Sequence, residues 1–130
     1  MHRRKVLLAD DDPSLRQLVA TTLGTDSFTS LHAGDGDESL AITRSERPEL
    51  VLLDVNMPGL NGLEVCAAIK GDERLREIKV VMLTASGNFE DQERARALGA
   101  DDYFVKPFSP VALLDKIYDL LDETTPSPPE

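Results

Sequence analysis

The amino-acid sequence predicts an α/β fold in which helices cover both faces of one doubly wound, five-stranded parallel sheet. Short apolar runs recur along the chain, segments with apolar residues at helical spacing lie between them, and the two alternate five times. A strand buried on both faces reads as an unbroken apolar run, whereas a strand with one wet face alternates. The length of 130 residues suits one domain with one core.

The predicted strands are recognised by their apolar runs. Four of these runs are unbroken: Val6-Leu7-Leu8-Ala9, Leu50-Val51-Leu52-Leu53, Val80-Val81-Met82-Leu83 and Tyr103-Phe104-Val105. A weaker, mixed run from Phe28 to Ala33 predicts a second strand that lies nearer an edge of the sheet.

Helical patterns fill the segments between these runs. Asp12-Pro13 offers an N-cap followed by proline at the first helical position, and Ser109-Pro110 does the same for the last helix. Gly24 and Gly99 are expected to end the first and fourth helices. The other helices are expected over residues 35–44, 63–69 and 89–98. This alternation predicts right-handed crossovers and the flavodoxin-like strand order 2-1-3-4-5.

Reactive side chains follow four of the predicted strands, at the point where each strand ends. They are Asp10 and Asp11 after the first strand, Asp54 after the third, Thr84 after the fourth and Lys106 after the fifth. The carboxyl ends of parallel strands meet at one edge of an open sheet, and ligands bind there where the strand order reverses. We therefore expect these groups to converge on a crevice between the first and third strands.

Three carboxylates in one small crevice repel one another, so without a cation at least one is driven toward its protonated form. Mg²⁺, or Mn²⁺ in its place, removes this conflict because it prefers oxygen ligands and shares its shell with phosphate oxygens. Asp54 can then act as a nucleophile toward phosphorus. Lys106 would stabilise charge on the transferring group, and the Thr84 hydroxyl would donate a hydrogen bond to it.

Over residues 3–122 the sequence resembles the receiver domain of two-component response regulators. The motifs that carry the resemblance are Val6-Leu7-Leu8-Ala9-Asp10-Asp11-Asp12-Pro13, Leu53-Asp54-Val55-Asn56-Met57-Pro58-Gly59 with Gly62, Leu83-Thr84-Ala85, and Gly99-Ala100-Asp101-Asp102-Tyr103-Phe104-Val105-Lys106-Pro107-Phe108. The resemblance implies that Asp54 accepts the phosphoryl group. The implied magnesium ligands are Asp10, Asp11, Asp54 and the backbone carbonyl of Asn56. A cis peptide bond before Pro107 is also implied.

The resemblance further implies a two-state switch. Phosphorylation would draw Thr84 toward the pocket, Tyr103 would turn inward, and the surface over residues 88–121, from the fourth helix through the fifth strand to the fifth helix, would change shape. The phosphoryl donor would be a sensor histidine kinase or a phosphotransfer protein, and the target a downstream protein or a fused output domain. Dimer formation on phosphorylation stays open. In this family the positions of Asn56 and Ser86 help to set the lifetime of the phosphoryl group.

Charge and composition bound the partners and the compartment. The net charge of -10 disfavours direct contact with nucleic acid or an anionic membrane surface, because both require a basic patch. No apolar stretch approaches the roughly 18 residues of a membrane span. Cys66 is the only cysteine, which fits a reducing cytosol, so we expect a cytoplasmic protein. Residues 1–122 would form the receiver domain, and residues 123–130 a flexible tail or a linker stub.

Two other functions compete with a signalling switch. Dehalogenase-like hydrolases also form an aspartyl phosphate, but they place a second Asp two residues after the nucleophile, where this chain has Asn56. A receiver-like module could instead bind a partner regardless of phosphorylation, although the intact acidic residues, Thr84 and Lys106 argue against this. We expect a switch that performs only self-phosphorylation and autodephosphorylation, and no other enzymatic reaction.

Overall fold

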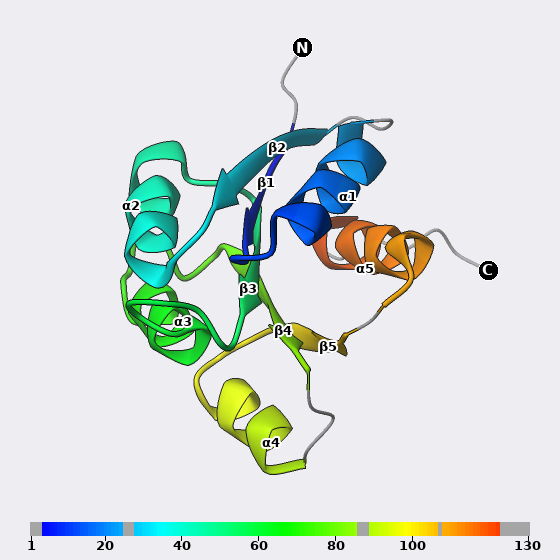
Figure 1. Ribbon diagram of the computed structural model, residues 1–130. Coiled ribbons are helices and arrows are strands. Elements are labelled where there is room, and N and C mark those ends of the chain that lie inside the picture. The colour runs from blue at the N-terminus through cyan, green and yellow to red at the C-terminus, as the bar shows by residue number, and fades with distance from the viewer. Residues whose placement is uncertain (1–3, 25–27, 86–88, 107, 123–130) are drawn as a thin grey trace, which may run out of the picture.

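One parallel sheet lies between two layers of helices in the computed structural model, which describes residues 4–24, 28–85, 89–106 and 108–122 (Figure 1). The strands are β1 (Arg4–Ala9), β2 (Phe28–Ala33), β3 (Leu50–Asp54), β4 (Lys79–Thr84) and β5 (Asp102–Val105). They pair in parallel in the order β2-β1-β3-β4-β5. The predicted fold class and strand order are therefore confirmed.

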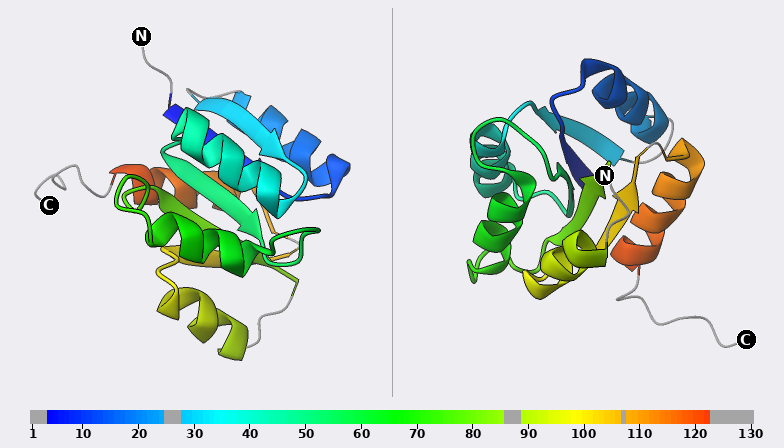
Figure 2. Two further views of the ribbon diagram at one scale, coloured as in Figure 1. Left: turned by 90° about the vertical axis from the view of Figure 1, so that its left-hand side faces the viewer. Right: turned by 60° about the horizontal axis from the view of Figure 1, so that its bottom comes forward.

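Five helices alternate with the strands in the described residues. They are α1 (Pro13–Gly24), α2 (Gly36–Glu46), α3 (Gly62–Lys70), α4 (Phe89–Ala97) and α5 (Pro110–Asp122). Helices α1 and α5 cover one face of the sheet, and α2, α3 and α4 cover the other (Figure 2). Within the described part of the chain, no helix is both long enough and apolar enough to cross a membrane.

Two hydrophobic clusters form, one on each face of the sheet. Successive residues of a strand point to opposite faces, so Leu7 and Leu53 pack toward α2 and α3, while Leu8 and Leu52 pack toward α1 and α5. All four side chains are fully buried. This two-sided burial is the reason the central strands read as unbroken apolar runs. The edge strand β2 is only half-buried in its middle, as its mixed sequence indicates.

The caps at the ends of three helices agree with the sequence. The Asp12 carboxylate accepts a hydrogen bond from the backbone N–H of Ser14 at 2.9 Å, which caps α1. The Ser109 hydroxyl accepts one from Ala112 at 3.3 Å at the start of α5. Gly99 follows α4 with a φ of 98°, a conformation that glycine adopts without steric cost.

The loop after β3 packs tightly because glycines line its path. A Cβ on Gly62 would collide with the backbone carbonyl of Asp54, and a Cβ on Gly36 would collide with that of Leu60. Helix α3 starts at this loop with Asn61 as N-cap, in a capping box with Glu64. The loop therefore holds the end of β3 against the start of α3.

Three sequence expectations fall on residues outside the described ranges. They are the cis peptide bond before Pro107, the role of Ser86, and the tail over residues 123–130.

We expect Gly62→Ala to lower the free energy of unfolding by about 1 to 3 kcal/mol, because the added methyl group overlaps the carbonyl of Asp54. Gly24→Ala is the matched control. A Cβ at Gly24 meets no atom within 4 Å, so this change should cost nothing or stabilise by up to about 1 kcal/mol. Urea unfolding followed by circular dichroism measures both, and equal stabilities of the two variants would contradict the proposed overlap.

Candidate functional site

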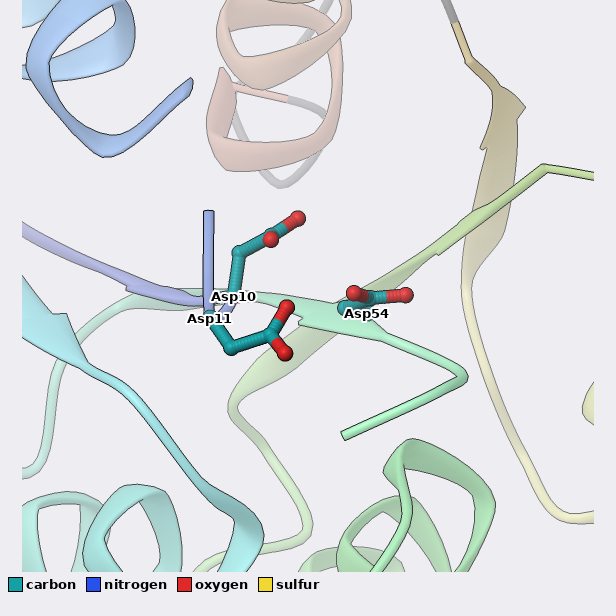
Figure 3. A group of neighbouring side chains, drawn as sticks. All are labelled: Asp10, Asp11 and Asp54. Carbon is teal, nitrogen blue, oxygen red and sulfur yellow. The ribbon is translucent and has the colours of Figure 1, made fainter. Parts of the chain in front are cut away.

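Three aspartates meet at the carboxyl ends of β1 and β3, where the strand order reverses (Figure 3). Asp10 follows β1 and is fully buried, Asp54 is the last residue of β3 and is 6% exposed, and Asp11 is exposed. Each residue offers a carboxylate oxygen, and these oxygens lie within 4.8 Å of one another. The convergence that the strand ends predict is therefore present.

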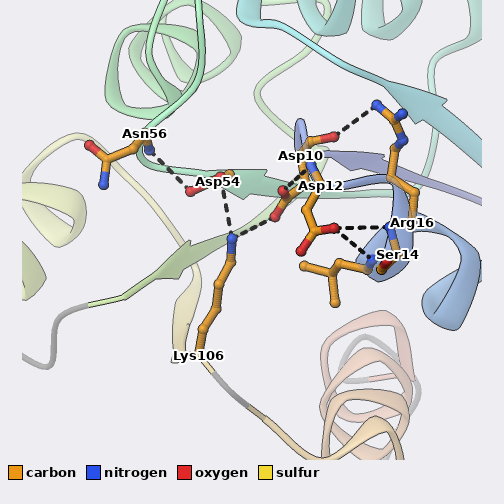
Figure 4. A network of polar contacts seen from close by, with 8 residues as sticks. Asp10, Asp12, Ser14, Arg16, Asp54, Asn56 and Lys106 are labelled. Atoms are coloured by element: carbon orange, nitrogen blue, oxygen red, sulfur yellow. Dashed lines mark hydrogen bonds and ion pairs between the residues drawn. The ribbon is translucent and has the colours of Figure 1, made fainter.

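Lys106 bridges two of the three carboxylates. Its Nζ lies 2.7 Å from Asp10 Oδ2 and 3.3 Å from Asp54 Oδ2 (Figure 4). The backbone N–H of Lys106 donates to the carbonyl of Thr84 at 2.7 Å, which ties the end of β5 to the end of β4. One ammonium group thus contacts two of the three carboxylates, and the group has an excess of two negative charges when all three are ionised.

The turn after β1 orients Asp10. Its Oδ1 accepts a hydrogen bond from the backbone N–H of Asp12 at 2.9 Å, while its Oδ2 pairs with Lys106. The backbone carbonyl of Asp10 also accepts a hydrogen bond from Arg16 Nη1 at 3.0 Å (Figure 4). Sequence reasoning did not identify Arg16, because an arginine in the first turns of a helix carries no pattern that points to a backbone contact.

Asp54 is held from both sides. Its Oδ1 accepts a hydrogen bond from the backbone N–H of Asn56 at 3.1 Å, and its Oδ2 faces Lys106. The N–H of Val55 donates to the carbonyl of Leu83 at 2.9 Å, so the ladder between β3 and β4 continues past the site. The exposed Asn56 reaches Asp54 through its main chain.

The surroundings raise the pKa of Asp54. Burial is the largest cause and the charge on Asp10 adds to it, although the Asn56 N–H and Lys106 act in the opposite direction. Burial alone would lower the pKa of Lys106, but its hydrogen bond to Asp10 and the charge on Asp54 raise it. Lys106 therefore stays a cation, and the uncompensated charge is negative. A divalent cation with a preference for oxygen ligands fits this set of donors.

The remaining predicted residues lie on the neighbouring strands. Thr84 ends β4 at the same edge as Asp54 and is 5% exposed. Tyr103 lies in β5, is half-buried, and packs against the hydrophobic cluster beneath α2, α3 and α4 rather than within the polar network. The structure thus joins Asp10, Asp54 and Lys106 directly and adds Asp11 at the rim, with Thr84 nearby.

This combination of sheet order and polar network is typical of a receiver domain. The family model of the response regulator receiver domain matches residues 6–118, so the chain belongs to this family.

Curated relatives align over nearly the whole chain. A probable transcriptional regulator, ycf27 of Cyanophora paradoxa, is 41% identical over 124 residues, which are 95% of this chain and 51% of the relative. The DNA-binding response regulator MtrA of Mycolicibacterium smegmatis is 38% identical over 128 residues, 98% of this chain and 55% of the relative. The chain therefore spans about half the length of these relatives.

Solved receiver structures share the fold. The chemotaxis protein CheY4 of Vibrio cholerae superposes with a TM-score of 0.86 at 34% identity, covering 92% of this chain and 99% of that one. The BeF3-activated receiver domain of Klebsiella pneumoniae RstA gives a TM-score of 0.83 at 29% identity, with coverage of 91% and 98%.

The expectation that direct contact with nucleic acid is excluded is wrong. MtrA is named as a DNA-binding response regulator and ycf27 as a probable transcriptional regulator. The net charge of -10 belongs only to these 130 residues, whereas the relatives are about twice as long. An acidic domain can be joined to a second domain of opposite charge, so the net charge of one does not exclude DNA for the whole.

We expect Asp54→Asn to raise the free energy of unfolding when divalent cations are removed by a chelator. The substitution relieves the buried, repelled carboxylate while Lys106 keeps its contact with Asp10. The free energy of unfolding should rise by roughly 0.5 to 2 kcal/mol, the usual size of a stabilising substitution. Urea unfolding at neutral pH measures it, with the exposed Asp115→Asn on α5 as control, which should change stability by less than about 0.5 kcal/mol. A loss of stability in Asp54→Asn would contradict the repulsion.

Proposed function

We propose that this protein is a phosphorylation-dependent signalling switch in which Asp54 accepts a phosphoryl group. Its membership of the receiver family supports phosphorylation-based signalling in general. The observation that carries the assignment of Asp54 is its position at the rim of the sheet beside Asp10 and Asp11, with Oδ2 3.3 Å from the Nζ of Lys106. The donor is the phosphohistidine of a sensor kinase or of a phosphotransfer protein.

The proposed cofactor is Mg²⁺, with Mn²⁺ as a substitute. Asp10, Asp11 and Asp54 would hold it together with the backbone carbonyl of Asn56. The spacing of the carboxylate oxygens and their excess negative charge support this set of ligands. When bound, the cation supplies neutralising charge to the carboxylates and to the oxygens of the incoming phosphoryl group.

In the proposed phosphoryl transfer, Asp54 is the nucleophile and the side chains around it stabilise the transferred group. A carboxylate oxygen of Asp54 forms a bond to phosphorus as the P–N bond to the donor histidine breaks, and the electron pair of that bond returns to the imidazole. Asp54 then carries an acyl phosphate. Lys106 keeps Asp10 as a partner and turns its remaining hydrogen-bond capacity to the phosphoryl oxygens. Thr84 donates its hydroxyl to another of these oxygens.

The output of the switch is proposed to be the surface of α4, β5 and α5. Thr84 and Lys106 are joined by a 2.7 Å backbone hydrogen bond, so a shift at the phosphoryl group reaches the end of β5 directly. Tyr103 lies in the same strand and would turn inward as Thr84 moves. Shifting such an equilibrium from mostly inactive to mostly active needs about 5 kcal/mol of differential interaction, which a few charge-assisted hydrogen bonds supply.

The downstream partner is proposed to be a DNA-binding output domain in the same polypeptide. The DNA-binding name of one relative and the twofold greater length of the relatives support this. We also propose that the described domain turns over no small phosphate ester. Asn56 occupies the place of the second catalytic acid of dehalogenase-like hydrolases, and its amide lacks a carboxyl group to transfer protons.

Incubation with acetyl phosphate and Mg²⁺ is expected to add a single phosphoryl group to the native chain and none to Asp54→Asn. Intact mass spectrometry measures the addition. Asp12→Asn is the matched control, because Asp12 lies beside the site but caps α1, and asparagine caps equally well. This variant should be phosphorylated like the native chain. Modification of Asp54→Asn, or none of the native chain, would refute the assignment.

Addition of beryllofluoride and Mg²⁺ is expected to shift the amide resonances of residues 84–108, because the mimic occupies the phosphoryl position and repositions Thr84 and Tyr103. Two-dimensional ¹⁵N NMR of the whole chain measures the shifts, and size-exclusion chromatography of the same samples reports any dimer. Asp54→Asn should not respond. If the native chain binds the mimic but the amide resonances of residues 84–108 do not shift, the switch proposal is wrong. The domain would then be a module that binds partners regardless of phosphorylation.

A further inference from the structure

A small cavity of about 230 Å³ lies between the end of α2 and the turn that follows α3. Helices α2 and α3 lie side by side in all three views of the molecule (Figures 1 and 2). The lining residues are Arg44, Arg47, Asp72, Arg74 and Leu75. Helix α2 ends before β3 begins, so the cavity belongs to the amino edge of the sheet, opposite Asp54. Among these lining residues, three guanidinium groups stand against one carboxylate, an excess of two positive charges. Glu73 lines the adjoining hollow together with Arg44, Asp72 and Arg74.

Arg44 and Arg47 are both exposed to solvent. Neither Arg44 nor Arg47 makes a side-chain hydrogen bond or ion pair with any residue among those that the structure describes. By contrast, Lys5 pairs with Glu46 at 3.0 Å and Lys70 with Asp101 at 3.0 Å. The cavity therefore gathers three arginines around one lining carboxylate, Asp72, in a chain whose net charge is -10.

Asp72 organises the third arginine. Its Oδ1 accepts the backbone N–H of Arg74 at 2.9 Å and faces the side-chain Nε of Arg74 at 3.5 Å. The backbone hydrogen bond is the main cause of the lowered pKa of Asp72, and the charges of Arg74 and Arg44 add to it. The carboxylate thus stays ionised, holds Arg74 at the cavity and offsets part of the positive charge that Arg44 and Arg74 bring to it.

The backbone of Arg47 is unusual. It is the C-cap of α2, with a φ of 48° and a ψ of 62°, and among the described residues no other non-glycine residue has a positive φ. This left-handed conformation costs an L-residue roughly 1 to 2 kcal/mol, and helices more often end there with glycine or asparagine. An arginine at this position keeps a guanidinium group at the cavity despite that cost, which is an indication of function.

Interaction with the helix dipole explains only part of this arrangement. Basic residues near the carboxyl end of a helix are stabilised by its partial negative charge, which applies to Arg44 and Arg47. Arg74 comes from a different segment, beyond α3, and is drawn to the same cavity by Asp72. The dipole does not require this convergence.

We propose that the cavity formed by Arg44, Arg47 and Arg74 binds a dianionic phosphate group. Guanidinium groups present paired N–H donors that match the oxygens of phosphate, and a phosphate monoester carries about -1.5 to -2 charge at neutral pH, close to the excess positive charge of the cavity. The cavity is smaller than the roughly 300 to 1,000 Å³ of sites for larger ligands, so it suits recognition of the group alone. Inorganic phosphate and a phosphorylated side chain of a partner protein share this chemistry.

The test is an NMR titration of the whole chain with inorganic phosphate in metal-free buffer, at constant ionic strength with chloride as reference. We expect saturable shifts in residues 44–47 and 72–75 that chloride does not produce. Arg47→Gly should weaken the apparent affinity at least tenfold, and this variant should stay folded because glycine suits the left-handed backbone. Arg94→Gln, an exposed arginine of α4 outside the cavity, should bind like the native chain.

A neutral peptide with one phosphoserine distinguishes the two sources of the group. Binding at least tenfold tighter than inorganic phosphate identifies a phosphorylated partner, whereas equal affinity identifies the free ion. The proposal is overturned if residues 44–47 and 72–75 respond to neither probe, respond equally to chloride, or respond unchanged in Arg47→Gly. Asp54→Asn should bind phosphate at this cavity as well as the native chain does. Failure of the cavity proposal can therefore be told apart from failure of the proposed phosphoryl transfer to Asp54.

Discussion

The parallel pairing of β1 with β3 is the constraint on which the functional site depends. Ala9 lies opposite Leu53, so the next residues of the two strands, Asp10 and Asp54, leave the sheet at the same edge. In a parallel sheet a slip of one residue would turn the side chains of a strand to the opposite faces. Both faces of β1 and β3 are buried, so such a slip would exchange the side chains between the two close-packed clusters and disrupt the packing of both. Core packing therefore positions the carboxylates.

The site that results is electrostatically incomplete. Asp10 is buried, pairs with Lys106 and accepts a hydrogen bond from the turn after β1. Asp54 is buried beside it and shares the same lysine at a longer distance. Burial and like charge both work against ionisation of Asp54. Such a site lowers the stability of the fold and is favoured only in a protein that uses the charge. The proposed cation and phosphoryl group are the species that would relieve this conflict.

Clusters of opposite charge lie at the two edges of the sheet. Carboxylates gather at the carboxyl edge, around Asp54, whereas Arg44, Arg47 and Arg74 gather at the amino edge. The proposed cation site and the proposed phosphate site therefore lie at opposite edges of a domain whose net charge is strongly negative. Net charge was a poor guide to partners because it describes only these 130 residues, whereas the relatives are about twice as long.

The sequence by itself determined the order of strands and helices and the edge at which the site forms. Unbroken apolar runs predict strands covered on both faces, and the caps Asp12 and Ser109 mark helix starts through local hydrogen bonds. Only the tertiary structure decided that Lys106 pairs with Asp10 as well as with Asp54, and that Arg16 supports the backbone of Asp10. It also decided that Arg47 and Arg74 line the same cavity. These contacts depend on loop paths and side-chain rotamers between distant segments, and no periodicity in a sequence encodes them.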